Sequence, residues 1–173
     1  MLRKCLVTFV PIVFMLFSVA GQGTLVKKMD LAEMCEVAGR IFRGTVVDIE
    51  KGTVSAGGGD VPTITYQIAV TERFKGSFPA PSNDELILSI TIADLRVVDV
   101  PRLAVGQEYL LLTTTPSAVG LSTMVGLAQG TFRIYGAARK EMTVNGLNNA
   151  GLIDGLRGPI PYQDMANHIR SAL

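Results

Sequence analysis

Residues 63–74 alternate apolar and polar side chains more regularly than the rest of the chain. Ile64, Tyr66, Ile68 and Val70 fall on one side of an extended backbone, and mostly polar residues fall on the other. A period of two predicts a strand with one face in the core and one face toward water or a partner. Because a strand of this kind buries its apolar face only within a sheet, the pattern predicts a mainly β fold.

Other stretches rich in β-branched and apolar residues predict further strands. Gly44 lies inside the first of them and predicts a bulge or bend. Residues 51–62 carry four glycines and a proline between two strands, which predicts a flexible connection. The expected strands are 41–50, 85–95 and 108–114, then one broken or two short strands within 121–135, with 142–145 returning as a hairpin partner.

Two short helices are expected at the ends of this β region. Asp30 is a good N-cap with Glu33 three residues on, and apolar side chains recur with helical spacing from Leu31. Residues 162–173 place apolar side chains four apart and predict a closing amphipathic helix. Short strands with glycine-marked bends favour closure, which removes sheet edges. We therefore expect a closed antiparallel barrel of five or six strands, with a short helix at each end.

The first twenty residues have the order of a secretory signal peptide. Arg3 and Lys4 precede an apolar run, and small residues precede a cleavage point after Ala20. The alternative is an uncleaved membrane anchor, but the apolar run is shorter than the roughly 20 residues that span a bilayer, and Pro11 interrupts it. The sequence predicts a leader over residues 1–20 and one exported domain over residues 21–173, either periplasmic or extracellular.

The charge balance argues against polyanionic partners. The chain has 173 residues and a formal net charge of +1. Loss of the leader would remove Arg3 and Lys4 and leave the product close to neutral, without a basic stripe. We expect neither nucleic acid nor a membrane surface as the partner of the mature protein.

Cys35 is the only cysteine beyond the predicted leader. In an oxidising compartment a single cysteine forms an intermolecular disulfide, remains a reactive thiol, or packs as a small apolar side chain. Its place on the apolar stripe of the first helix favours packing, and burial among apolar groups raises a thiol pKa and lowers its reactivity.

The sequence offers little catalytic or metal-binding chemistry. His168 is the one histidine, and neither it nor Cys35 has neighbouring residues with the spacing of metal ligands. Asn145, Asn148 and Asn149 favour turn formation over ligand binding. We expect no metal, no cofactor and no catalytic residues, with a Cys35–His168 hydrolase as the weakest alternative.

Three segments together resemble the netrin-like domain, the OB-type barrel of the tissue inhibitors of metalloproteinases. They are AGRIFRGTVVDIE (38–50), ITYQIAVTERFKG (64–76) and PRLAVGQEYLLL (101–112). The resemblance implies protein binding, with a secreted protease as the partner. In those inhibitors an N-terminal cysteine chelates the protease zinc, whereas this chain has Gly21, Gln22 and Gly23 after the leader. That inhibitory mechanism therefore does not transfer.

These observations favour an exported, non-catalytic module that binds another exported protein. OB-type barrels bind through the face of their second and third strands and the flanking loops, here residues 51–62 and 115–123. A structural accessory of the cell envelope, with copies of the chain joined through Cys35, is the alternative. The candidate partner-binding residues are Ser55, Gly57, Gly58, Gly59, Asp60, Ser117 and Ser122.

Overall fold

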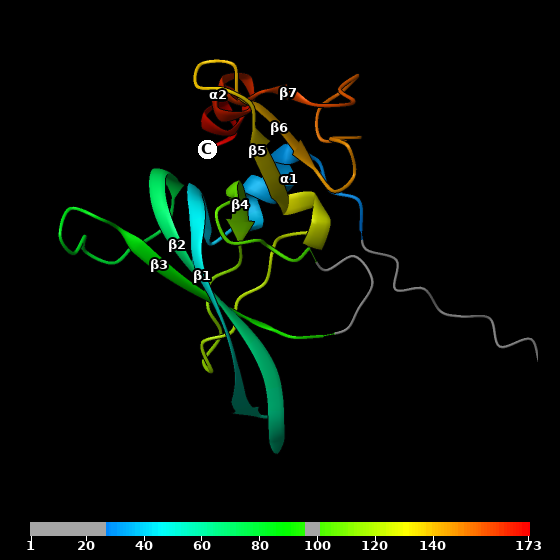
Figure 1. Cartoon of the computed structure of the whole chain (residues 1–173). Helices are drawn as coiled ribbons and strands as arrows, with labels where there is room; N and C mark the ends of the chain where they lie inside the picture. The colour runs from blue at the N-terminus through cyan, green and yellow to red at the C-terminus, as the bar shows by residue number, and fades with distance from the viewer. Residues whose placement is uncertain (1–26, 96–100) are drawn as a thin grey trace, which may run out of the picture.

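The computed structural model describes residues 27–95 and 101–173 of the chain. Within these residues an antiparallel sheet has the strand order β3-β2-β1-β4-β5-β6-β7, and two helices lie beside its β4–β6 half (Figure 1). The expected mainly β fold with two helices is confirmed. The elements are α1 (Leu31–Val37), β1 (Arg40–Ala56), β2 (Gly59–Lys75), β3 (Ile87–Ala93), β4 (Glu108–Thr113), a 3-10 turn (Leu127–Gly130), β5 (Thr131–Tyr135), β6 (Met142–Asn145), β7 (Ile160–Pro161) and α2 (Tyr162–Ala172).

The expected closed barrel of five or six strands is not what the strand pairing gives. Over residues 27–95 and 101–173 the sheet has seven strands and is open, with β3 at one end and β7 at the other. Residues 121–125 lie between β3 and β4 but make only isolated bridges, Thr91 with Leu121 and Thr113 with Met124. Positive φ angles at Gly120 and Gly126 turn the backbone at each end of this segment.

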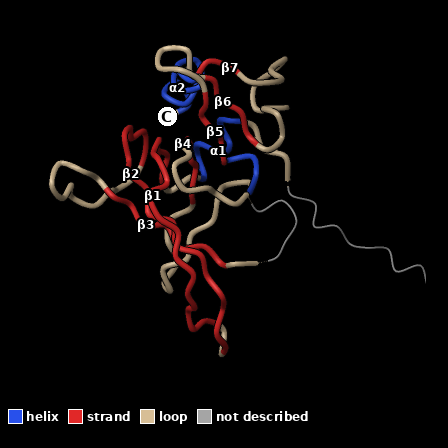
Figure 2. Tube along the Cα trace, in the orientation of Figure 1, coloured by secondary structure: helices blue, strands red, loops and turns tan. Residues whose placement is uncertain are grey.

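The long hairpin of β1 and β2 corrects a second expectation. Residues 51–62 are not a flexible connection, because both strands continue through them in regular antiparallel register as far as the pair Ala56 and Gly59. Gly57 and Gly58 have φ angles of 61° and 82° and close a two-residue turn that suits glycine. Figure 2 shows this hairpin extending well away from the rest of the molecule. We call residues 47–62 the ribbon.

The bulge expected at Gly44 is confirmed. The β1–β2 register shifts between Arg43 and Gly44. A Cβ atom at Gly44 would lie 2.6 Å from the carbonyl oxygen of Ala69 and 2.6 Å from Cγ2 of Ile68. Only glycine allows the two strands to approach this closely.

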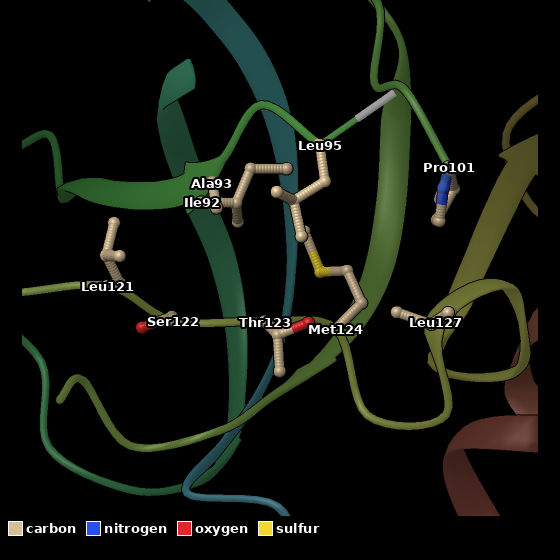
Figure 3. A pocket seen from close by; sticks show the side chains of 9 residues that line it. All are labelled: Ile92, Ala93, Leu95, Pro101, Leu121, Ser122, Thr123, Met124 and Leu127. Carbon is tan, nitrogen blue, oxygen red and sulfur yellow. The ribbon is translucent and has the colours of Figure 1, made fainter. Parts of the chain in front are cut away.

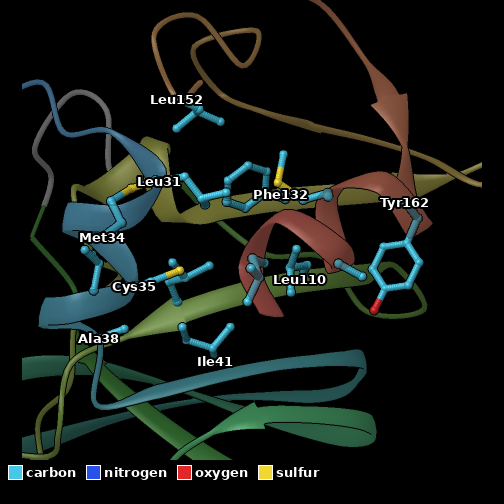
Figure 4. Packing of buried hydrophobic residues seen from close by; sticks show 14 of the residues in the cluster. Leu31, Met34, Cys35, Ala38, Ile41, Leu110, Phe132, Leu152 and Tyr162 are labelled. Atoms are coloured by element: carbon cyan, nitrogen blue, oxygen red, sulfur yellow. The ribbon is translucent and has the colours of Figure 1, made fainter. Parts of the chain in front are cut away.

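Two apolar clusters stabilise the sheet, and β4 contributes to both. Leu110 and Leu112 point into the first cluster, which includes α1 and α2 (Figure 4), whereas Tyr109 and Leu111 point into the second cluster under β1, β2 and β3. The near-continuous apolar sequence of β4 follows from this burial on both faces.

The C-terminal half agrees in part with the sequence. The expected hairpin forms, with Phe132 opposite Asn145 and Ile134 opposite Thr143, and the closing helix is α2. Residues 121–135 form one regular strand only at their end, because the 3-10 turn precedes β5. Among the described residues no helix is long and apolar enough to cross a membrane. The predicted leader, residues 1–20, lies outside the described residues.

Candidate functional site

The ribbon carries most of the candidate residues, and its side chains are exposed or partly exposed. None of its residues is buried, and Val47 at its base is 43% exposed. Ile49 near the base packs against the second cluster. Beyond Ile49 the pairing rests on backbone hydrogen bonds and on cross-strand contacts. An exposed two-stranded projection of this kind offers backbone and side chains from both faces to a partner.

The tip of the ribbon contains Ser55, Gly57, Gly58, Gly59 and Asp60. The hydroxyl of Ser55 donates a hydrogen bond of 2.9 Å to Oδ1 of Asp60 across the two strands. No other atom lies within 4 Å of a Cβ built on any of the three glycines. The tip is thus small, polar and unobstructed.

Ser117 and Ser122 have different surroundings. Ser117 is exposed and closes a local turn, because its Oγ accepts from the Leu121 N–H at 3.1 Å and its carbonyl accepts from the Gly120 N–H at 2.9 Å. Ser122 is 8% exposed, and its N–H donates to the Thr91 carbonyl at 2.8 Å. Ser117 therefore has a turn-forming role, and Ser122 is fixed against β3.

Ser122 also lines a small apolar cavity of about 150 Å³. Figure 3 shows the side chains of Leu95 and Met124 pointing toward each other across this cavity. Its walls come mainly from the end of β3 and from residues 121–124. The cavity holds few polar groups, so it offers little to orient a polar ligand.

The structure brings only part of the predicted surface together. Thr63, next to the ribbon, pairs with Ala93 at the end of β3, and the neighbouring Thr91 bonds Ser122. The base of the ribbon and Ser122 are therefore linked across β3. The tip residues lie at the far end of the ribbon, and their register pairing involves only β1 and β2.

Cys35 is buried, as the sequence predicted. Its side chain is 0% exposed and packs in the first cluster between Met34 and Ala38 (Figure 4). Burial raises the pKa of the thiol to about 11, and the nearby Lys75 ammonium only partly offsets this. His168 is exposed on α2. The thiol is enclosed while the imidazole faces solvent, an arrangement that does not suit a nucleophile and its base.

A charge cluster that the sequence analysis missed centres on Arg43. Its guanidinium donates paired hydrogen bonds to Glu108, at 2.6 and 2.7 Å, and to Glu141, at 3.0 and 2.7 Å. It also lies 4.3 Å from the centre of the Tyr162 ring. The hydrogen bond to Glu108 has the largest effect on the pKa of Arg43 and raises it. Desolvation lowers this pKa, but with the added effect of the Glu141 carboxylate the pKa of Arg43 is raised overall.

A second set of contacts extends this cluster to the C-terminal helix. The Tyr162 hydroxyl donates to Glu72 Oε2, and Arg170 forms an ion pair with the same carboxylate. Burial is the main reason that the pKa of Tyr162 is raised, and the Glu72 carboxylate raises it too. Each of these charges has an opposite partner, so the cluster anchors α2 to the sheet.

Asn145 and Asn149 also have a structural role. Asn145 Oδ1 accepts from the N–H groups of Leu147 and Asn149, and Asn149 Nδ2 donates to the carbonyls of Thr143 and Gly158. These bonds satisfy buried backbone groups around the turn after β6. The turn-forming interpretation of the asparagines is confirmed for these two residues.

Across residues 27–95 and 101–173, no three His, Cys, Asp or Glu side chains gather in a way that would hold a metal ion. Comparison with known proteins finds that no protein family and no curated protein matches the chain.

Proposed function

We propose that this chain is an exported, non-catalytic module that binds another protein through the ribbon. The observation that carries the proposal is the ordered projection of residues 47–62, none of which is buried. A hairpin without a core is marginal on its own and adds little to the stability of the body. A protein-binding role accounts for its length, its regular pairing and its exposure.

The strand arrangement supports an OB-type ancestry for the binding half. β1 lies between β2 and β4, and residues 121–125 bond both β3 and β4: Ser122 N–H donates to Thr91, and Val125 N–H donates to Leu112. The OB fold is a five-stranded, partly open barrel, and the loop between its first two strands contacts ligands. We propose a netrin-like, partly closed version of that barrel.

The partner that we propose is another exported protein, and the netrin-like resemblance suggests a secreted protease. Export is proposed from the leader-like residues 1–20. Binding is favoured over catalysis because the Arg43 cluster is internally paired and Cys35 is enclosed. The alternative, copies of the chain joined through Cys35, would require the first apolar cluster to open.

A ribbon deletion tests the proposal. Removing residues 53–56 and 59–62 joins Gly52 to the Gly57–Gly58 turn and the turn to Thr63, and facing pairs are lost together so that the register is kept. No buried side chain is removed, so we expect unfolding free energy to fall by less than about 1 kcal/mol, mainly from the lost Asp94 N–H to Pro62 bond.

Affinity capture with the exported protein as bait supplies the binding readout. Proteins from the periplasm or culture fluid that the complete chain retains should be lost with the shortened chain. Arg133→Met, an exposed substitution outside the ribbon, is the control and should retain them. Equal capture by the complete and the shortened chain would rule out the ribbon as the contact element.

A further inference from the structure

The two long edges of the ribbon differ in what they offer to a partner. On the β2 side, β3 pairs as far as Thr63, and the Asp94 N–H donates a 2.7 Å hydrogen bond to the Pro62 carbonyl. Proline has no N–H to donate. The β2 edge is therefore obstructed next to the body and lacks a donor at Pro62.

The same contact establishes which groups face outward on β1. Pro62 is opposite Thr53, and its carbonyl points to Asp94 rather than to β1. In an antiparallel ladder, hydrogen-bonded pairs alternate with pairs that are not bonded. The N–H and C=O of Thr53 therefore point away from β2, and the same alternation directs those of Lys51 and Ser55 outward.

This β1 edge has no neighbouring strand in the described part of the chain. β4 pairs with β1 only from Arg40 to Thr45, and the last backbone contacts are those of Val46 with Gly106 and Gln107. The Ile49 N–H is occupied by the Asp48 carboxylate at 2.8 Å. Residues 51–55 remain, in unshifted register with β2, with three outward N–H and three outward C=O groups.

The charges along this edge indicate the chemistry of its partner. Asp48 and Glu50 lie on the outer face of β1, on the same side as Thr65 of β2, and form no ion pair within the described residues. Lys51 and Asp60 are the other charged residues of the ribbon, which leaves it net acidic. Two copies of this net acidic ribbon would repel each other, whereas a basic strand would be attracted.

We propose that the β1 edge at residues 51–55 accepts an extended, basic segment of the partner protein as an added strand. This inference rests on the proposed function and specifies how the ribbon binds. Backbone hydrogen bonds to Lys51, Thr53 and Ser55 supply affinity, and lysine or arginine side chains of the added strand lie beside Asp48 and Glu50.

The probe is a synthetic peptide with blocked ends that alternates threonine and valine and carries two lysines on one face. Amide hydrogen exchange followed by NMR reports where it binds. At millimolar peptide we expect slower exchange at Lys51, Thr53 and Ser55. The same peptide with glutamates in place of the lysines should bind more weakly, and Glu50→Gln should reduce this preference.

Thr53→Pro removes one outward N–H and keeps the bonds between β1 and β2, because Thr53 is in a pair without hydrogen bonds. We expect it to weaken peptide binding about ten-fold. Thr53→Val retains the N–H and should bind like the original chain. The NMR spectrum of each variant shows whether the ribbon still pairs.

With the peptide, the inference is overturned by no protection at millimolar concentration, or by unchanged binding to Thr53→Pro with an intact ribbon. Without the peptide, it is overturned by a doubled molecular mass together with protection of the same amides. The last result would assign the edge to a second copy of the chain. A captured protein that is lost with the shortened ribbon but retained by Thr53→Pro would leave the proposed function standing and remove only edge pairing.

Discussion

Arg43 contacts residues from several segments that lie far apart in the sequence. Arg43 belongs to β1, and its guanidinium donates hydrogen bonds to Glu108 at the beginning of β4 and to Glu141 just before β6. The same guanidinium lies over the Tyr162 ring of α2. Its side chain is 15% exposed, and those of the two carboxylates are 26% and 23% exposed. Partial burial makes each charge depend on the others, because water only partly replaces a lost partner.

Substituting Arg43 should therefore destabilise the fold. Arg43→Met keeps the aliphatic stem but leaves two carboxylates without their cation, and we expect a loss of about 2–3 kcal/mol, below the value for fully enclosed pairs. Urea unfolding followed by circular dichroism measures it. Arg133→Met, at an exposed site whose guanidinium lies 5.2 Å from the Tyr135 ring centre, should cost less than about 1 kcal/mol. Equal losses would contradict the structural role of Arg43.

The Glu141 carboxylate makes this part of the fold sensitive to acid. Its hydrogen bond with Arg43 lowers its pKa from the ordinary 4.5. The unfolded chain therefore binds the proton more readily than the folded chain, so this contribution to stability is complete above pH 4.5 and is lost as pH falls through the lower folded pKa.

Glu141→Gln should lower stability at neutral pH and reduce the further loss on acidification. Urea unfolding free energies measured from about pH 7 to about pH 3 test this slope. Glu33→Gln is the control: the pKa of Glu33 is also lowered by Lys27, but its side chain is 42% exposed, so the change in slope should be smaller. A larger effect at Glu33 would show that Arg43 is not the main acid-sensitive contact.

At the scale of elements, sequence alone could predict the features that depend on residues close together in the chain. The capping box of Asp30 and Glu33 forms as expected, because both partners lie within one helical turn. The ribbon was missed because small residues and glycines have the composition of a loop. A signal was present: the glycines at 57–59 lie midway between Val54 and Val61, which face each other, and such a run suits a tight hairpin turn.

Long-range contacts were beyond sequence reasoning for a physical reason. Arg43 bonds Glu108 because β1 and β4 pair side by side, with Gly44 opposite Tyr109. It bonds Glu141 because the β5–β6 hairpin brings that residue alongside. No local pattern encodes these registers. The unpaired β1 edge likewise depends on where β4 ends, so neither it nor the charge cluster was among the predicted sites.

Gly44 and Gly52 provide a matched test of the β1–β2 packing. Gly44→Ala places a Cβ 2.6 Å from the Ala69 carbonyl oxygen, and the strands must separate to admit it. We expect a loss of about 1–3 kcal/mol in unfolding free energy. Gly52→Ala meets only the Thr63 hydroxyl, at 3.3 Å, and should change stability by less than about 0.5 kcal/mol. Similar losses in both variants would contradict a close approach specific to Gly44.

At the scale of the whole molecule, two apolar clusters share the same central strands. β1 contributes Ile41 to the first cluster and Phe42 to the second, and β4 alternates between them in the same way. Neither cluster can lose its packing without disturbing a strand that also serves the other. This sharing explains how an open sheet with helices on one half can behave as one cooperative unit.

The last prediction is that a small defect in one cluster lowers the stability of both. Ile169→Val removes a buried methylene from α2 in the first cluster and should cost about 0.5–1.5 kcal/mol. Fluorotyrosine NMR reports on Tyr162 in that cluster and on Tyr66 in the second. Because β1 and β4 join the clusters, both signals should disappear at the same, lowered temperature. Loss of the Tyr162 signal ahead of that of Tyr66 would mean that the helical half unfolds separately, and that residues 21–173 do not form the single domain that the sequence predicts.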